Sequence, residues 1–100
     1  MKYIAMEHEV ADATAEDFQP HLKAEAAHLW HLYQEGVVRE SYFRADQHTA
    51  VLMLECEDEA AVCEALDSLP LVRAGLISFE IIPLMPYSGF ARLFEENKPF

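Results

Sequence analysis

Two spacings of apolar residues alternate along this chain. In short segments every second residue is apolar, which is typical of β-strands, whereas in longer ones apolar residues recur every three or four positions, as in helices. The sequence therefore predicts strands over 2–8, 37–44, 50–57 and 76–84, and helices over 18–36 and 58–68. On the first helix the apolar positions at this spacing are Phe18, Leu22, Ala26, Leu29 and Tyr33.

Capping and turn residues support these boundaries. Thr14 or Asp17 suits the N-cap of the first helix, and Gly36 suits its end. Asp58 suits the N-cap of the second helix, Leu69-Pro70-Leu71 ends that helix, and Gly75 suits a turn before the last strand. The order β-α-β-β-α-β is typical of α+β ferredoxin-like folds, with a four-stranded antiparallel sheet and two helices on one face. We expect one such domain over residues 1–86 and a C-terminal tail over 87–100 that packs on the domain or on a partner subunit.

Alternation within the strands predicts which residues face the helices. The continuous apolar set is expected on that side, and a mixed set on the other. The first set contains Ile4, Met6, Ala50, Leu52, Leu54, Cys56, Ile77, Phe79 and Ile81. The second contains Tyr3, Ala5, Glu7, Val51, Met53, Glu55, Leu76, Ser78, Glu80 and Ile82. A solvated face would rarely carry so many apolar residues, so we expect a second copy to cover it, sheet against sheet about a two-fold axis.

Composition narrows the classes of partner. The chain has 100 residues, 52% of them hydrophobic, and 18 acidic against 7 basic residues give a net charge of −11. So few scattered cations argue against nucleic acid and against an anionic membrane surface. No apolar run is long enough for a signal peptide or a membrane span, so we expect a cytoplasmic protein. Nucleotide-binding and covalent-catalysis motifs are lacking, which predicts no cofactor.

Glu55 and Glu80 are the first candidates for catalysis. On the mixed face, with Tyr3 and Ser78 on the same side, a carboxylate among apolar neighbours gains a raised pKa and can act as a general base. The hairpin register decides which donor joins them. A two-residue turn places Tyr42 and Glu40 beside Met53, and one residue more places Arg39 opposite Glu55. The alternative for this set is an ion pair or a polar contact between subunits.

The histidines of the first helix are the second group of candidates. His28 and His31 are three residues apart, and His21 lies seven before His28. His28 is the candidate acid or base, because it neighbours Leu29 and Glu25 near the expected inner face. The alternative is that these histidines are solvated or lie at the edge of the core. A zinc site needs a third ligand, and none is suitably spaced, so no metal is predicted.

The chain resembles muconolactone Δ-isomerase and its relatives over about residues 3–85. The resemblance rests on "LKAE" in the first helix, on Glu35-Gly36 and Arg39 within "EGVVRE", and on Leu69-Pro70-Leu71 before the last strand. It implies a dimeric α+β barrel, as a homodimer or higher homo-oligomer, and a cofactor-free proton transfer on a small carboxylic acid or lactone. The His-rich first helix and the tail after Pro86 depart from the isomerase pattern. The alternatives are a non-catalytic member that binds a ligand or only assembles, and a cofactor-free monooxygenase.

The tail carries more aromatic residues after the last strand. Pro83 and Pro86 lack amide donors and end the strand, and Gly89 allows a turn. Phe90, Leu93 and Phe94 then fall on one face of a single helical turn. We expect residues 87–94 to reach the partner subunit and to close an end of the barrel between the two subunits, or its pocket. The alternative is that they pack on their own subunit. Residues 95–100 are expected to fray.

Overall fold

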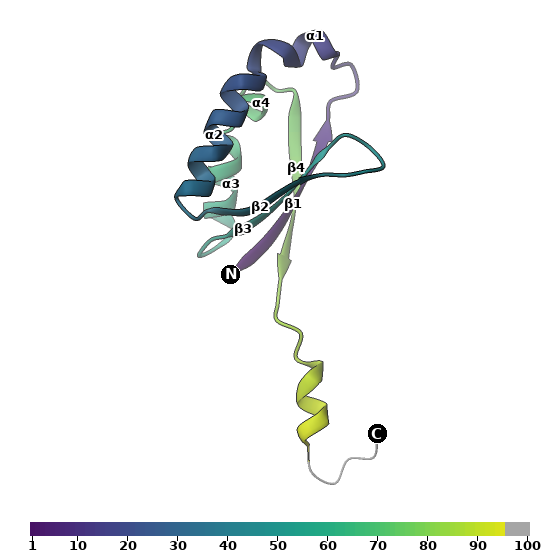
Figure 1. Cartoon of the computed structure of the whole chain (residues 1–100), viewed down its shortest axis with the longest axis vertical. Helices are drawn as coiled ribbons and strands as arrows, with labels where there is room; N and C mark the ends of the chain where they lie inside the picture. The colour runs from purple at the N-terminus through teal and green to yellow at the C-terminus, as the bar shows by residue number, and fades with distance from the viewer. Residues whose placement is uncertain (96–100) are drawn as a thin grey trace.

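Four strands form one antiparallel sheet with helices on a single face (Figure 1). The computed structural model describes residues 1–95. The strands are β1 (Lys2–Glu9), β2 (Val38–Phe43), β3 (Ala50–Glu55) and β4 (Ile77–Leu84), in the spatial order β2-β3-β1-β4. The helical segments are α1 (Ala15–Phe18), η1 (Gln19–His21), α2 (Leu22–Gln34), α3 (Glu59–Asp67), α4 (Pro70–Arg73) and η2 (Gly89–Phe94). The predicted ferredoxin-like order is confirmed.

Local signals set the helix ends as predicted. Thr14 and Asp17 form a reciprocal capping box, in which each side chain accepts from the backbone N–H of the other. The Asp58 carboxylate accepts from Ala61 N at 2.9 Å and caps α3. Gly36 and Gly75 have φ values of +78° and +75°, a conformation that only glycine adopts without strain. Both therefore reverse the chain between a helix and the next strand.

The hydrophobic core lies between the sheet and the helices α2 and α3. The strands contribute Tyr3, Ala5, Val38, Leu52 and Leu54, and the helical layer contributes Leu32, Val62, Leu66 and Leu69. These side chains leave at most 6% of their surface exposed, so the two layers form one continuous core.

The facing of β1 differs from the prediction. Tyr3 lies opposite Leu54 and Ala5 opposite Leu52, so these two residues point toward the helices and Ile4 and Met6 do not. Paired residues in an antiparallel ladder lie on the same face of the sheet. Leu52 and Leu54 of β3 face the helices as predicted, so their partners on β1 do as well. Both alternating sets of residues in β1 are largely apolar, so the pattern of β1 alone could not decide which set faces the helices. The prediction that Ile4 and Met6 face the helices is wrong.

The buried face of α2 is also rotated from the expected one. Leu32 is the buried residue of the helix, and His21, Glu25, His28 and Leu29 are half-buried around the same side. The predicted stripe is largely exposed instead. Leu22 is 44% exposed and Tyr33 51%, and Trp30 beside them is 59% exposed. Polar residues thus occupy the inner side of α2, while apolar residues remain on its surface.

The hairpin register places Glu40 opposite Met53 and Tyr42 opposite Val51. Val38 lies opposite Leu54, so a bulge puts Arg39 and Glu40 together against Met53. The register with Tyr42 on the open sheet face is therefore the observed one. Arg39 sits in the bulge, where its Nε donates to Gly36 O at 2.6 Å.

The chain leaves the domain after β4. Residues 85–95, here called the C-terminal arm, extend away from the sheet and helices and stretch the molecule to 62 Å along its longest axis (Figure 1). Phe90, Leu93 and Phe94 fall in the short helix η2 and are 61–83% exposed. The predicted helical turn is confirmed, and its packing stays a prediction. Residues 96–100, most of the segment expected to fray, lie outside the described residues.

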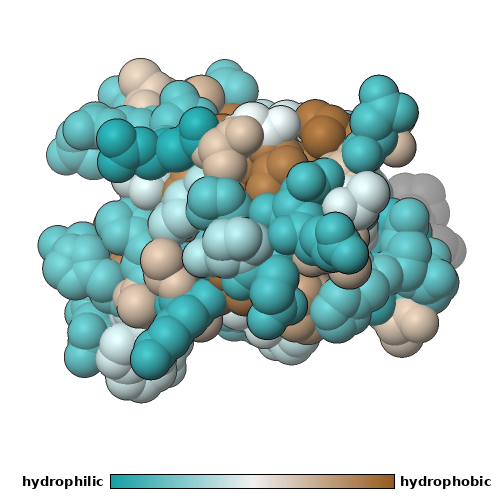
Figure 2. Space-filling view, turned by 90° about the horizontal axis from the view of Figure 1, so that it is seen from above, coloured by the Kyte–Doolittle hydropathy of each residue, from teal (hydrophilic) through white to brown (hydrophobic). Residues whose placement is uncertain are grey.

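Hydrophilic residues dominate the end of the molecule that carries α1, with a patch of hydrophobic residues between them (Figure 2). None of the helices within residues 1–95 combines the length and the apolar character that a membrane crossing requires.

Candidate functional site

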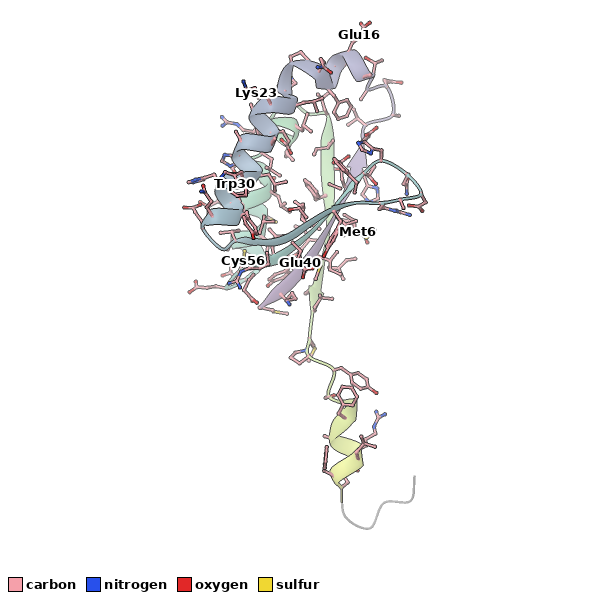
Figure 3. All side chains as sticks on the ribbon, in the orientation of Figure 1. Met6, Glu16, Lys23, Trp30, Glu40 and Cys56 are labelled. Atoms are coloured by element: carbon pink, nitrogen blue, oxygen red, sulfur yellow. The ribbon has the colours of Figure 1, made fainter. Side chains whose placement is uncertain are left out.

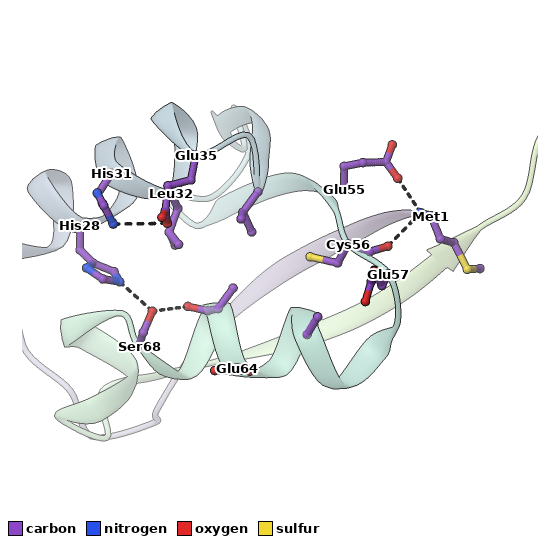
Figure 4. Close-up of a pocket in the computed structure, with 13 residues that line it drawn as sticks. Met1, His28, His31, Leu32, Glu35, Glu55, Cys56, Glu57, Glu64 and Ser68 are labelled. Atoms are coloured by element: carbon purple, nitrogen blue, oxygen red, sulfur yellow. Dashed lines mark hydrogen bonds and ion pairs between the residues drawn. The ribbon is translucent and has the colours of Figure 1, made fainter.

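A groove of about 680 Å³ runs between α2 and α3, and we call it the α2–α3 groove (Figure 4). Its apolar lining comes from Leu32, Val37, Ala61 and Ala65. His28, His31, Glu35, Glu55, Glu57, Glu64 and Ser68 supply the polar groups. Because it joins an apolar lining to titratable groups, it is the strongest candidate for a small-molecule site in the described chain.

His28 is held in this groove by Ser68. Nε2 of His28 lies 2.7 Å from Oγ of Ser68, and that hydroxyl donates to Ala65 O at 2.5 Å (Figure 4). A serine hydroxyl has one proton, so Ser68 accepts from His28 Nε2–H. The lone pair of the neutral imidazole is then on Nδ1. This arrangement makes His28 a possible base and leaves Ser68 without a proton to give the ring, unlike a nucleophilic serine.

Glu25 lies one turn before His28 on the inner side of α2. Its Oε1 accepts from Leu71 N at 2.9 Å, near the start of α4. Burial raises the pKa of Glu25, while the Leu71 hydrogen bond and the nearby His28 and His21 act in the opposite direction. A carboxylate and an imidazole thus lie close together at the joint between α2 and α4.

Glu7 lies on the sheet, close enough to Glu25 for the charge of Glu25 to affect its pKa. It is opposite Phe79 on the side of β1 that faces the helices, and it is half-buried. Burial raises the pKa of Glu7, and the charges of Glu9 and Glu25 raise it further, against the effects of the Ala50 amide and His48. Glu7 on the sheet and Glu25 on α2 are therefore two half-buried carboxyl groups whose ionisation is disfavoured.

Glu55 has a different environment from the one expected of a base. Its Oε2 lies 2.6 Å from the amino group of Met1, which also donates to Cys56 O at 2.8 Å. This contact holds the pKa of Glu55 below its ordinary range, and the charge of Arg39 adds to the effect. Glu55 does line the same groove as His28, but as a carboxylate with little basicity.

The other predicted residues are dispersed. Glu80 is exposed and lies 3.5 Å from His8 Nε2, and Ser78 is exposed opposite His8. Tyr42 donates to Glu40 Oε1 at 2.5 Å, and this hydrogen bond raises the pKa of the phenol.

Tyr3 is placed on the opposite side of the sheet from the one expected. It is 3% exposed, and its hydroxyl donates to Met1 Sδ at 3.5 Å. Burial and the charges of Asp58 and Glu59 raise its pKa. It does not share a face with Glu55 and Glu80, so the expectation that these three residues lie on one side is wrong.

Glu55 and Glu80 also do not meet within one subunit. Met6 pairs with both Val51 and Glu80, so Glu80 aligns with Val51, four residues before Glu55 and two strands away. Standard strand geometry puts them roughly 16 Å apart. Within the described residues of one subunit, Glu55 and Glu80 therefore do not form a pair of carboxylates.

Ser68 and Glu25 were not singled out from the sequence as site residues. Glu25, His28 and Leu32 recur at helical spacing and could have indicated an inner face with polar groups. Ser68 lies 40 residues from His28, and no local pattern links them. Across residues 1–95, no group of three or more His, Cys, Asp or Glu side chains is arranged to hold a metal ion.

Solved structures of low sequence identity share this fold. Muconolactone isomerase is 18% identical with a TM-score of 0.70, and the match covers 88% of this chain and 94% of the isomerase. The 5-chloro-2-hydroxyhydroquinone dehydrochlorinase of Burkholderia phenoliruptrix, in complex with 2,5-dihydroxybenzoquinone, is 17% identical with a TM-score of 0.61. That match covers 85% of this chain and 94% of the dehydrochlorinase.

No protein-family model matches the chain, and no curated protein matches it at a significant level. The structural matches confirm the predicted ferredoxin-like fold and its resemblance to the fold of muconolactone isomerase.

Proposed function

We propose that the protein is a homodimer that binds a small molecule and transfers a proton on it without a cofactor. The homodimer is supported by the open sheet face. Met53, Ile4 and Ile82 form an apolar row across β3, β1 and β4, and Met6 and Val51 pair beside it. Helices cover only the other face (Figure 1). A second sheet packed on this row would remove it from water, as in sheet-on-sheet packings.

The observation that carries the proposed activity is the contact between His28 and Ser68. It orients the imidazole within the α2–α3 groove and assigns its proton to Nε2. A base in a fixed orientation beside a bound C–H acid is what a cofactor-free isomerisation requires. Nδ1 would take the proton from the substrate and return it to a neighbouring carbon.

The charge of the groove narrows the substrate class. Glu35, Glu55, Glu57 and Glu64 line it, and the charged nitrogen among the lining groups is the Met1 amino group, already paired with Glu55. An anionic substrate would be repelled by these carboxylates. We therefore favour an uncharged lactone or enol over a carboxylic acid.

The test is the exchange of substrate C–H protons in D₂O, followed by NMR on a panel of small uncharged lactones and enolisable ketones. His28→Gln removes the base and should lower the exchange rate by about 100-fold to 10,000-fold. His48→Gln is the matched control. His48 is exposed in the hairpin and lies outside the groove, so the H48Q variant should exchange the substrate proton at the wild-type rate. Equal rates in wild type and H28Q would remove His28 from the mechanism.

One observation favours the non-catalytic alternative. Both carboxylates predicted as bases already have partners: Glu55 pairs with the Met1 amino group, and Glu80 pairs with His8. If no compound of the panel exchanges faster with wild-type protein than with buffer, while compounds still shift resonances of groove residues, a ligand-binding role without catalysis is preferred.

A further inference from the structure

The exposed apolar stripe of α2 forms part of a second groove, next to the edge of the sheet. This groove, of about 400 Å³, is lined by Ala26, Leu29, Trp30, Tyr33 and Ser41, and we call it the α2–β2 groove. The rings of Trp30 and Tyr33 are stacked with centroids 5.5 Å apart, yet each ring residue is more than half exposed. No charged residue lines it. Large exposed aromatic residues around an uncharged groove are typical of binding surfaces.

The C-terminal arm presents exposed aromatic and apolar side chains that could fill the α2–β2 groove. Tyr87 and Phe90 pack edge to face with ring centroids 4.9 Å apart, and Phe90, Leu93 and Phe94 follow along η2. All four are more than 60% exposed. A helical turn this short does not persist in water by itself, so it needs a surface to pack on. Within the described chain, nothing covers it.

Topology indicates whose groove the arm reaches. β2 and β4 are the two open edges of the sheet. When two such sheets pack face to face about a two-fold axis that runs along the strands, β4 of one subunit lies over β2 of its partner. The arm continues β4, and Trp30 and Tyr33 lie in the last turns of α2, just before β2 begins. The partner's α2–β2 groove therefore lies in the path of the arm.

The arm of the same subunit starts at the wrong edge for this contact. β4 and β2 are separated by β1 and β3, roughly 14 Å across the sheet. The arm also leads away from the helical layer. Figure 3 shows Trp30 on α2, with the side chains of the arm well below the domain.

We propose that the C-terminal arm of each subunit packs its aromatic residues into the α2–β2 groove of the partner subunit, so that two arms are exchanged across the dimer. This inference rests on the homodimer proposed above. Each arm would cover Trp30 and Tyr33 of the partner and shield the edge strand β2.

The test uses Trp30, the single tryptophan of the chain, as a built-in reporter. Acrylamide quenching of its fluorescence is measured in the full-length protein across a dilution series, with oligomeric state followed by sedimentation. The arm variant is Phe90→Ala with Phe94→Ala. The control is Val10→Ala, an exposed apolar residue in the loop after β1. We expect Trp30 to be protected in the dimer, and to become accessible on dilution. In the arm variant, Trp30 should stay accessible to acrylamide, and the dimer should dissociate with a Kd at least roughly tenfold higher than that of wild type. V10A should behave as wild type.

The outcomes separate this inference from the proposed dimer. A dimer whose Trp30 is equally quenched in wild type and arm variant overturns arm exchange and leaves the dimer standing. A wild-type monomer with accessible Trp30 at all concentrations overturns both. If Trp30 is protected in a monomer and this protection is lost in the arm variant, the arm fills the groove of its own subunit. That result would overturn the exchange of arms between partners.

Discussion

Nε2 of His28 lies 2.7 Å from the hydroxyl oxygen of Ser68, and this contact joins α2 to the end of α3 across the candidate site. The residues are half-buried and 40 positions apart in the chain. Because Ser68 gives its own proton to Ala65 O, the imidazole has one orientation and one assigned tautomer. The contact therefore links the stability of the helical layer to the chemistry proposed for the groove.

The coupling between His28 and Ser68 can be measured by a double-mutant cycle. With His28→Ala and Ser68→Ala, urea unfolding should give a coupling free energy of about 1 kcal/mol, as expected of a partly buried hydrogen bond. The exposed His31–Glu35 pair is the control and should couple by less than about 0.5 kcal/mol. Equal coupling in both pairs would contradict a fixed His28.

The Glu25 hydrogen bond predicts different effects of two substitutions. Glu25→Gln keeps an oxygen that accepts from Leu71 N and removes a carboxylate whose ionisation burial disfavours. At pH 7 it should be at least as stable as wild type. Glu25→Ala leaves the amide of Leu71 without its acceptor and should be less stable than E25Q by about 1 to 2 kcal/mol. Thermal or urea unfolding of both variants checks this order, and an E25A as stable as E25Q would show that the bond contributes nothing.

Glu7 predicts a dependence of stability on pH. Burial raises its pKa in the folded state above the ordinary value of 4.5, so folding favours the protonated form. That contribution is fully present below the unfolded pKa and is lost as the pH rises through the higher folded pKa. Glu7→Gln should therefore gain stability relative to wild type between pH 4 and pH 7. Urea unfolding at both pH values measures this difference, and a difference between the two proteins that does not change with pH would mean that Glu7 ionises freely.

The open sheet face predicts a residue on which dimerisation depends. Met53 lies opposite Ile4 in the apolar row, so Met53→Asp would place an unpaired charge at the proposed contact of the two sheets. The dimer should weaken by roughly 3 to 5 kcal/mol, while the fold of each subunit persists. Sedimentation equilibrium measures the loss, with Val10→Asp in an exposed loop as the control. A dimer as tight in M53D as in V10D would exclude this face.

Much of the fold could be predicted from the sequence because its signals are local. The caps Thr14 and Asp58 and the glycines Gly36 and Gly75 act on the few residues beside them, and the predicted element order followed from them. The candidate site was predicted only in part. His28 lies in the groove as an inner-face residue of α2, but its partner Ser68 comes from a helix with no local relation to it.

The sequence by itself determined which segments become strands and helices, because period, caps and turns are properties of neighbouring residues. Only the tertiary structure decided which side of β1 and α2 is buried. The segment Tyr3-Ile4-Ala5-Met6 is apolar on both faces, so its pairing with Leu52 and Leu54 of β3 decides which face is buried. On α2, packing against the sheet and α4 buried Leu32 and drew Glu25 inward to the Leu71 amide. The same rotation left Trp30 and Tyr33 at the surface, because a helix can turn only one side toward its own core.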